Sequence, residues 1–418
     1  MIFTKEEFKT KVEEIQSRSW YKNPIGFGVA RVDRGQLNKD KILQATYPVV
    51  NWNENFGSAA IFMDAFKTSG VEIDTTKNEL VLDITDDFIV NCIESFRPYL
   101  PEAKGEEHKN VQLISTLSVL PKELGLTPDD FKVVFIFEDT NPESVESAYL
   151  KLYALSSGKA PLRKTNLNGA FGLLHNVAWS DGKPIELDWL RANELTLKLT
   201  GKYPSIDMVD KFPRFLSHII PTDNTRILDT SKVRFGAQLA AGTTVMPGAS
   251  YINFNAGTLG PVMVEGRISS SAIVGSGSDV GGGASILGVL SGTDGEPITI
   301  GENCMLGAMS STGMSIGDGS FVEMGTVIHE SMPFFIEEKQ LNLINEVNKD
   351  KLISKDNKKL ITISYINKNG DDIEKTGYYF IGKELMSRRG IQYRDDKTAK
   401  VMVAFRSKKE VKLNEDLH

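Results

Sequence analysis

Hydrophobic residues recur at six-residue intervals from Val233 to Ile328. An α-helix repeats its faces every ~3.6 residues and a β-strand every ~2, so neither element alone explains a period of six. This period predicts a left-handed parallel β-helix, a prism with one short face per hexad and its aliphatic side chains turned inward. The hydrophobic positions are Val233, Leu239, Val245 and Tyr251; Val262, Ile268, Val274, Val280 and Ile286; Ile300 and Leu306; and Ile316, Val322 and Ile328.

The residues between these positions predict the corners of the prism. A small residue, such as Ala249 or Ala284, stands four places after most of the hydrophobic positions, where two faces meet and space is short. Glycines lie between them, as in Leu306-Gly307, and glycine adopts the backbone conformations that tight corners need. A flexible Gly-rich loop is the alternative, but such a loop has no reason to keep hydrophobic residues in phase.

The residues before the repeat, 1–224, predict an α/β N-terminal domain. Residues 1–18 have the pattern of a helix that Thr4 and Glu7 cap. The apolar run 131–137 predicts a buried strand, and Asn141 is placed to cap a helix after it. Residues 165–200 look extended. Nothing in this domain identifies a ligand.

The repeat ends near Pro333, and the remaining chain predicts a different structure. Residues 337–359 are charged and partly helical, and the turn at Asn369-Gly370 lies between two strand-like runs, which predicts a hairpin. We therefore expect a β-helix over 225–332 and a small β-rich C-terminal cap over 333–418.

Composition narrows the class of protein. Of the 418 residues, 40% are hydrophobic and 25% charged, and the net charge is −7, which favours neither nucleic-acid nor membrane binding. The two cysteines, Cys92 and Cys304, suit a reducing cytoplasm, and Cys304 falls on a small-residue position of the repeat, where we expect a buried thiol. The N-terminus is charged where a signal peptide needs apolar residues, and no apolar run is long enough to cross a membrane.

Flat-sided prisms favour closed rings of three, with concave sites in the grooves between neighbours. Polar residues that interrupt the repeat are therefore candidates for chemistry. Glu265 and Arg267 flank Gly266. Glu265 could act as a base or nucleophile, and Arg267 could hold a carboxylate through two hydrogen bonds. A solvated pair of corner residues is the alternative.

The triplet Gly281–Gly283 has more glycine than a corner needs. Bare backbone there could line a slot for a thin flexible chain, although plain corner glycine is the alternative. The run lacks the Gly-Lys-Ser/Thr of a phosphate-binding loop. The five histidines have no metal-ligand spacing, and we predict no metal. Basic residues gather near the C-terminal end of the chain, at Lys383, Arg388, Arg389 and Arg394. They could bind the phosphates of a nucleotide, or they could be the solvated edge of a strand.

Several strings resemble the tetrahydrodipicolinate N-succinyltransferases, in particular the subgroup with a large N-terminal domain. The strings are Asn253-Phe-Asn-Ala-Gly-Thr-Leu-Gly, Met263-Val-Glu-Gly-Arg-Ile-Ser, Gly275 to Ser285, Ile300-Gly-Glu-Asn-Cys-Met-Leu-Gly-Ala and Leu413-Asn-Glu-Asp-Leu-His. The resemblance covers about 225–330 and the extreme C-terminus, and is much weaker over 1–220. Relative to the family, residues 334–380 look like an insertion. It implies succinyl transfer from succinyl-CoA to the amino group of 2-amino-6-oxopimelate, the ring-opened substrate, in diaminopimelate and lysine biosynthesis, by a homotrimer with active sites between subunits.

The resemblance also implies residue roles. Glu265 matches the family's acyl-accepting carboxylate, and Arg267 matches an arginine near the succinyl group. Positions that match contacts of the coenzyme are Gly282, Ser285, Ala308, Glu323, Met324, Lys383 and Arg394. The sequence leaves open whether Glu265 first forms a mixed anhydride or only takes the amine proton.

The residues alone do not exclude two other functions. An acetyltransferase on the same scaffold, acting on the same amine or on a sugar nucleotide, would not need the cation of Arg267. A non-catalytic scaffold would explain the repeat, but it would explain neither the Glu-Gly-Arg interruption nor the basic C-terminal residues.

Overall fold

A computed structural model describes residues 2–119, 123–289, 293, 295–352, 358–367, 369–411 and 413. The chain divides into two compact units, Met1–Pro213 and Arg214–His418, and each is described by itself. Strands of the prism and of the cap share one sheet in the second unit, so the two units do not test whether the prism and the cap are separate domains. The division into three domains therefore stays a prediction. Within the described residues, no helix is long and apolar enough to cross a membrane.

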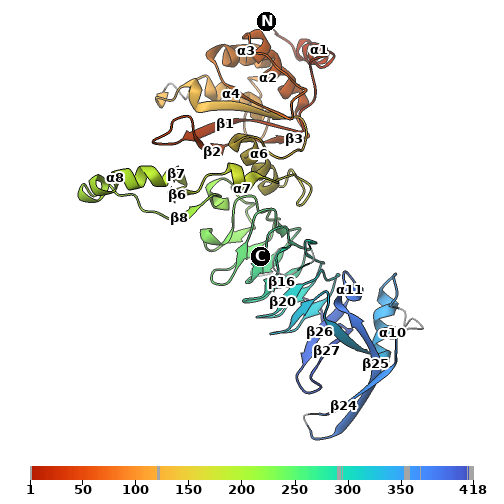
Figure 1. Cartoon of the computed structure of the whole chain (residues 1–418). Coiled ribbons are helices and arrows are strands. Elements are labelled where there is room, and N and C mark those ends of the chain that lie inside the picture. Colours follow the sequence, from red (N-terminus) through yellow and green to blue (C-terminus); the bar gives the residue numbers. More distant parts are fainter. Residues whose placement is uncertain are drawn as a thin grey trace. The chain divides into compact units, whose positions relative to one another are not determined.

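The first unit is built on an antiparallel sheet with the strand order β2-β1-β5-β4, and helices cover both of its faces (Figure 1). Phe27, Val29 and Phe135 share a core with α2, α3 and α4 on one face. Helix α6 packs against the other face, with every one of its residues buried. The elements are α1 (Lys5–Gln16), β1 (Gly26–Arg34), β2 (Ile42–Thr46), β3 (Asn51–Trp52), α2 (Phe56–Thr68), β4 (Glu79–Asp83), α3 (Asp86–Phe96), η1 (Arg97–Tyr99), α4 (Lys109–Leu117), η2 (Pro128–Asp130), β5 (Phe131–Ile136) and α6 (Val145–Ser156).

The end of this unit differs from the sequence prediction. Residues 165–200, expected to be extended, contain two helices. The helix after β5 is capped by the side chain of Ser144, and not by Asn141. The elements of this part are α7 (Ala170–Leu173), β6 (Val177–Ser180), β7 (Lys183–Ile185), α8 (Leu187–Leu199) and β8 (Met208–Asp210).

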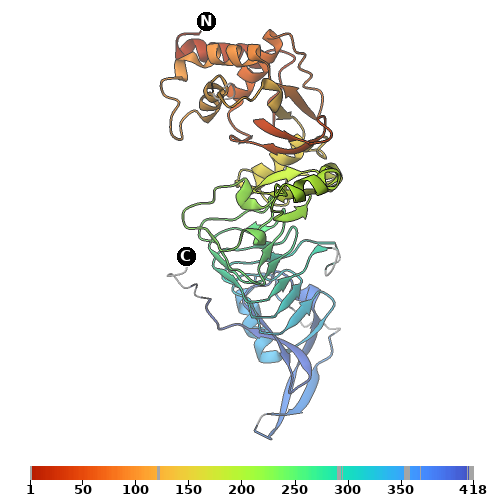
Figure 2. The ribbon, with the colours of Figure 1, turned by 90° about the vertical axis from the view of Figure 1, so that its left-hand side faces the viewer.

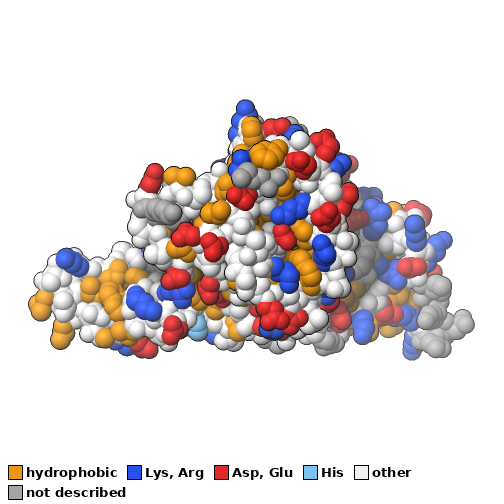
Figure 3. Space-filling model, turned by 90° about the horizontal axis from the view of Figure 1, so that it is seen from above, with side chains coloured by type: hydrophobic (Ala, Val, Ile, Leu, Met, Phe, Trp, Pro, Cys, Tyr) orange, Lys and Arg blue, Asp and Glu red, His pale blue; other side chains and the backbone are white. Residues whose placement is uncertain are grey.

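Helix α8 is mostly exposed: only Leu190 is buried, whereas Leu195 is 78% and Leu199 87% exposed. Figure 3 shows hydrophobic side chains gathered over the α8 end of the face drawn, at the left, and mixed acidic and basic side chains elsewhere.

The second unit begins with the predicted parallel β-helix, whose strands stack along the prism (Figure 2). Its first face consists of β9 (Arg226–Ile227), β10 (Thr244–Val245), β13 (Val262–Val264), β16 (Ser278–Val280), β19 (Met305–Leu306) and β21 (Phe321–Val322). The second face consists of β11 (Tyr251–Ile252), β14 (Arg267–Ile268), β17 (Ser285–Ile286), β20 (Ser311–Gly313) and β22 (Val327–His329). The third face consists of β12 (Gly257–Thr258), β15 (Ile273–Val274) and β18 (Thr299–Ile300). Short helices η3 (Phe215–Ser217) and η4 (Thr230–Lys232) precede the prism or join its first coils.

The interior of the prism confirms most of the six-residue pattern. On β11, however, the inward residue in register with Ile268 is Ile252, and not Tyr251 as the pattern predicted. Val262, Ile268, Val274 and Val280 belong to one core and are fully buried. Cys304 is buried there too, and burial raises the pKa of its thiol to about 12, so that it stays protonated at neutral pH.

The cap continues the first face of the prism. Strand β26 (Ile391–Asp396) pairs in parallel with β21, and the order runs on through β27 (Val401–Arg406), β23 (Pro333–Glu337), β25 (Asp372–Ile381) and β24 (Ile361–Ile366). The expected hairpin is formed by β24 and β25. Two helices, α10 (Glu338–Val347) and α11 (Gly382–Leu385), complete the cap.

Candidate active site

The candidate residues are brought together by the register of the first face. Val264, Val280, Leu306, Val322 and Tyr393 are successive partners across the parallel strands. The residues that directly follow these partners, one to three in each coil, therefore stand at the same corner, between the first and second faces. We call this set, which is listed last, the corner column. It consists of Glu265, Gly281–Gly283, Gly307–Met309, Glu323–Gly325 and Arg394.

Glu265 lies in the corner column with its carboxylate turned toward the following coil. Its backbone amide donates to the carbonyl of Val280 at 2.8 Å, and its carbonyl accepts from the amide of Gly283 at 3.2 Å. A Cβ atom on Gly282 would lie 3.5 Å from Oε2 of Glu265. The partly buried carboxylate is thus fixed at its backbone and faces bare main chain.

Glycine occupies the three positions below Glu265 for different physical reasons. A Cβ on Gly281 would lie 2.7 Å from the carbonyl oxygen of Leu306, so coil packing requires glycine there. Gly283 has a φ of +71°, which other residues rarely adopt. Gly282 has neither constraint, and among the described residues a Cβ atom built on it would meet only Oε2 of Glu265 within 4 Å. The bare backbone at Gly282 therefore keeps space open beside the carboxylate.

This difference predicts that alanine substitutions at the two adjacent glycines have different effects on the melting temperature. We expect Gly283→Ala to lower the melting temperature, because its backbone is left-handed and its Cβ would lie 2.7 Å from Sδ of Met309. Gly282→Ala should leave the melting temperature within about 2 °C, since its only Cβ contact has an ordinary distance. Thermal unfolding of the two variants is the measurement; equal destabilisation would contradict this account of the glycines.

Arg267 lies on β14, on the second face, and is exposed. Its Nη2 donates to Oγ of Ser285 at 3.0 Å, and the two residues are partners in the register of β14 and β17. Ser285 therefore orients a guanidinium whose plane remains open to solvent. The side chains of Glu265 and Arg267 belong to one coil edge, separated only by Gly266.

Glu323 and Arg394, which the sequence suggested as separate coenzyme contacts, pair with each other. Nε and Nη2 of Arg394 donate to the carboxylate at 2.7 and 2.6 Å, and Gln392 donates to it as well. Partial burial alone would raise the pKa of Glu323, but the hydrogen bonds from Arg394 and Gln392 outweigh burial and hold it below its usual value. The pair therefore stays ionised at neutral pH. No sequence pattern had pointed to Gln392.

Two more candidates, Ala308 and Met324, are exposed in the corner column between Gly282 and Arg394. Lys383 is not in the column. It belongs to α11, and its amide donates to the carbonyl of Glu330 at 2.6 Å, beyond the end of β22 at another corner of the prism. Among the described residues, no group of three or more metal-ligand side chains could hold an ion.

Models of known families match three parts of the chain. They are described as tetrahydrodipicolinate N-succinyltransferase N-terminal, over residues 6–172, its middle part, over 174–214, and the hexapeptide repeat of succinyl-transferase, over 297–330. The first two models cover most of residues 1–220, where the sequence strings showed a much weaker resemblance, so the likeness to the family extends over that region as well. Of the C-terminal string that contributed to the resemblance, only Leu413 lies within the described residues.

Individual relatives extend this likeness to the whole chain. Proteins named 2,3,4,5-tetrahydropyridine-2,6-dicarboxylate N-succinyltransferase are 58% identical in a Nitratiruptor species and 52% identical in Campylobacter jejuni, with full coverage of both chains. A 1.90 Å crystal structure from Campylobacter jejuni, described as a 2,3,4,5-tetrahydropyridine-2-carboxylate N-succinyltransferase, has a TM-score of 0.86 and 50% identity over 99% of this chain and 100% of that one. The match to the Nitratiruptor protein includes residues 334–380, which are therefore no insertion relative to it.

The parallel β-helix, the family models that span both units and full-length relatives agree with the resemblance first seen in the Glu-Gly-Arg and Asn-Phe-Asn-Ala-Gly-Thr strings. The chain belongs to the tetrahydrodipicolinate N-succinyltransferase family.

Proposed function

We propose that this chain transfers a succinyl group from succinyl-CoA to the amino group of ring-opened tetrahydrodipicolinate, and that Glu265 and Arg267 carry the reaction. One observation carries this proposal: a carboxylate facing bare backbone and an exposed, oriented guanidinium lie on one coil edge. The carboxylate suits proton transfer and the guanidinium suits the free carboxylate of a succinyl group. The names of the full-length relatives support the same reaction.

In the step that we propose, the carboxylate of Glu265 accepts a proton from the substrate ammonium, and the amine nitrogen attacks the thioester carbonyl carbon. An N–C bond forms and negative charge develops on the carbonyl oxygen. The C–S bond then breaks, and the departing coenzyme thiolate takes the second proton of the attacking nitrogen, so that a neutral amide and free thiol leave and Glu265 returns its proton to solvent. The amide of Gly282 donates no hydrogen bond within the described residues, so it can donate to this oxyanion. The alternative, with Glu265 attacking first to form a mixed anhydride, uses the same residues.

The corner column supports the position of the donor. From β13 to β26 the column spans four strand spacings, or ~19 Å at ~4.8 Å each. This distance is comparable to the extended arm between the sulfur and the phosphates of coenzyme A. Between Glu265 and Arg394, the column presents small or exposed residues, namely Gly282, Ala308 and Met324. We propose that the arm lies along the column, with its thioester at Glu265.

Arg267→Lys should reduce kcat/KM for succinyl-CoA by about tenfold and change the value for acetyl-CoA much less. A lysine cannot form the planar pair of hydrogen bonds with a carboxylate, and acetyl-CoA has no such carboxylate. Steady-state kinetics with the two donors is the measurement. A loss of the same size with both donors would contradict the assignment of Arg267.

We also propose that the protein is a homotrimer with active sites between neighbouring prisms. The open side of Arg267 and the exposed leucines of α8 support further chains packing on this one. Light scattering should give three times the mass of the chain, and a monomer at assay concentration with full activity would contradict the shared site.

The function itself is tested by release of free thiol from several acyl-CoAs, measured with a thiol dye in the presence and absence of the amine substrate. We expect amine-dependent release that is fastest with succinyl-CoA. Faster release with acetyl-CoA would show an acetyltransferase, and no amine-dependent release with any donor would leave the prism as a scaffold.

A further inference from the structure

A polar hollow of about 450 Å³ lies in the first unit, where helices α2 and α4 begin. Asn55 and Ser58 line it from the start of α2, and Lys109 and Asn110 line it from the start of α4. The corner column belongs to the second unit, so this hollow is separate from the candidate active site. Its lining therefore needs an explanation of its own.

Both helices begin without a side-chain cap. Their N-cap residues, Asn55 of α2 and His108 of α4, have left-handed backbones, and neither side chain accepts a hydrogen bond from its helix. In the same unit, Thr85 caps α3 and Ser144 caps α6. The positive ends of two helix dipoles thus meet at one hollow, each without the oxygen acceptor that usually covers it.

The first backbone amides of these helices are correspondingly unused. Within the described residues, the amides of Phe56 and Gly57 in α2 donate no hydrogen bond, and neither do those of Lys109 and Asn110 in α4. Helix starts with unused amides bind anions, but water can also satisfy such amides. The side chains at the floor of the hollow decide between the two.

The floor consists of asparagine side chains, two of which are buried. Asn51 is 1% and Asn110 4% exposed, and their amides pair reciprocally at 2.9 and 3.1 Å. Asn55 donates to the same oxygen of Asn51 at 2.7 Å. The amide nitrogen of Asn110 carries a second hydrogen, which has no acceptor among the described residues although the side chain is buried and lines the hollow. A buried donor of this kind indicates an acceptor in the hollow itself.

The charges around the hollow narrow the class of that acceptor. Both lysines that line it are already paired, Lys159 with Glu54 and Lys109 with Glu106. The donors that remain are neutral, and they suit the single charge of a carboxylate better than a phosphate, which carries nearly two charges at neutral pH. Glu107 is exposed and lines the hollow, and its carboxylate has no ion-pair partner among the described residues. It is available to an ammonium group.

We propose that this hollow binds a free α-amino acid, with its carboxylate at the starts of α2 and α4 beside Asn110 and its ammonium group at Glu107. The inference goes beyond the proposed function and does not depend on it. It gives the first unit a small-molecule site of its own.

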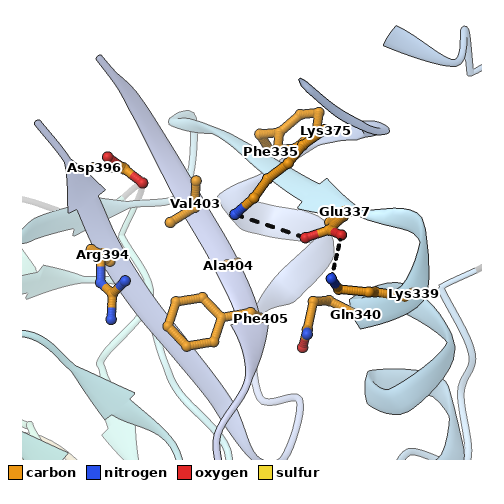
Figure 4. Close-up of a pocket in the computed structure, with 10 residues that line it drawn as sticks. All are labelled: Phe335, Glu337, Lys339, Gln340, Lys375, Arg394, Asp396, Val403, Ala404 and Phe405. Carbon is orange, nitrogen blue, oxygen red and sulfur yellow. Dashed lines mark ion pairs between the residues drawn. The ribbon is translucent and has the colours of Figure 1, made fainter. Parts of the chain in front are cut away.

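A hollow of the cap, with a volume of about 270 Å³, differs from this one (Figure 4). Arg394 on its wall belongs to the corner column, and Glu337 pairs with Lys339 at 2.8 Å and with Lys375 at 3.8 Å. It is therefore part of the site already described and indicates no separate ligand.

The test is calorimetry of the full chain with L-alanine, L-aspartate, L-glutamate and L-lysine as probes. We expect saturable binding of at least one of them to the wild-type protein. Ser58→Asp should weaken that binding at least tenfold, because it places a carboxylate of the protein at the start of α2, where the ligand carboxylate would lie. The same charge is favourable at a helix start, so the melting temperature should not fall.

Ser19→Asp is the matched control, because Ser19 is exposed in the turn after α1 and lies outside the hollow. We expect it to bind the amino acid as the wild-type protein does. Asn110→Asp decides if Ser58→Asp does not fold. It keeps the hydrogen bond that Asn51 donates to Oδ1, replaces the unused donor with a negative charge, and should also weaken binding at least tenfold.

Glu107→Gln tests the position of the ammonium group. This variant should bind the amino acid about threefold more weakly, the size of effect expected for an exposed ion pair. Propionate, which is L-alanine without its ammonium group, should bind the variant and the wild-type protein equally.

Two results would overturn the inference. One is wild-type protein that binds none of the four amino acids, or that binds inorganic phosphate instead. The other is amino-acid binding that persists in both Ser58→Asp and Asn110→Asp, which would place the ligand elsewhere, as in the acceptor site of the second unit. The proposed function fails separately, through the absence of amine-dependent thiol release, because calorimetry of this hollow requires no succinyl transfer.

Discussion

Glu265→Gln is expected to lower kcat for succinyl transfer by about 10³-fold, within the range that general-base catalysis contributes. The amide has nearly the same shape as the carboxylate, but it can neither take a proton from the ammonium nor attack a thioester. The backbone hydrogen bonds of residue 265 with Val280 and Gly283 do not depend on the side chain, so fold and assembly should be retained. Thiol release under saturating succinyl-CoA and amine is the measurement.

Glu302→Gln is the matched control for this substitution. Glu302 is also a glutamate of the prism, but it is exposed and lies at a different corner, beside Asp318. We expect wild-type kcat from the control. Near-normal kcat from Glu265→Gln would show that Glu265 is a solvated corner residue. A succinyl adduct on Glu265 after incubation with succinyl-CoA alone would select the route through the mixed anhydride.

Gly266→Ala is expected to destabilise the second unit by about 3 kcal/mol, the upper part of the range for overpacked sites. A Cβ atom at residue 266 would lie 2.3 Å from the carbonyl oxygen of Ala284, which is backbone and cannot rotate away. The coils would have to separate there, between the two proposed functional side chains. For a unit of this size, the melting temperature should fall by about 6–12 °C.

Gly282→Ala provides the comparison on the next coil, because a Cβ atom there would meet only Oε2 of Glu265, at 3.5 Å. The melting temperatures of Gly266→Ala and Gly282→Ala, measured by circular dichroism, should therefore differ clearly. If Gly266→Ala melts with the wild-type protein, the close approach of successive coils is wrong as described here.

The sequence predicted the parts of the fold that depend on local pattern. The six-residue period identified most of the inward side chains, although it selected Tyr251 where Ile252 is buried, and Thr4 with Glu7 forms the capping box expected for the first helix. Helix α8 was missed because it has little contact with a core, and Leu190 is its only buried residue. An exposed helix of this kind lacks a contrast between buried and solvent-facing positions that a pattern could reveal.

The candidate site was predictable only in part, for a related reason. Glu265 and Arg267 interrupt a regular repeat, so the local sequence is enough to mark them as candidate functional residues. The ion pair between Glu323 and Arg394 forms only because β26, which follows many cap residues later in the chain, pairs with β21. Phe405 enters the same region through a second pairing, between β26 and β27. Such non-local pairing leaves no periodic signal, which is why the sequence pattern did not predict these contacts.

The most direct test of the account is a crystal structure with an unreactive succinyl-CoA analogue in which the thioester is replaced by a thioether. We predict its succinyl carboxylate within hydrogen-bonding distance of Arg267 and its sulfur beside Gly282. Its arm should extend along Ala308 and Met324 toward Arg394. An analogue bound along either of the other two corners, or with its carboxylate away from Arg267, would contradict the proposed succinyl-transfer site.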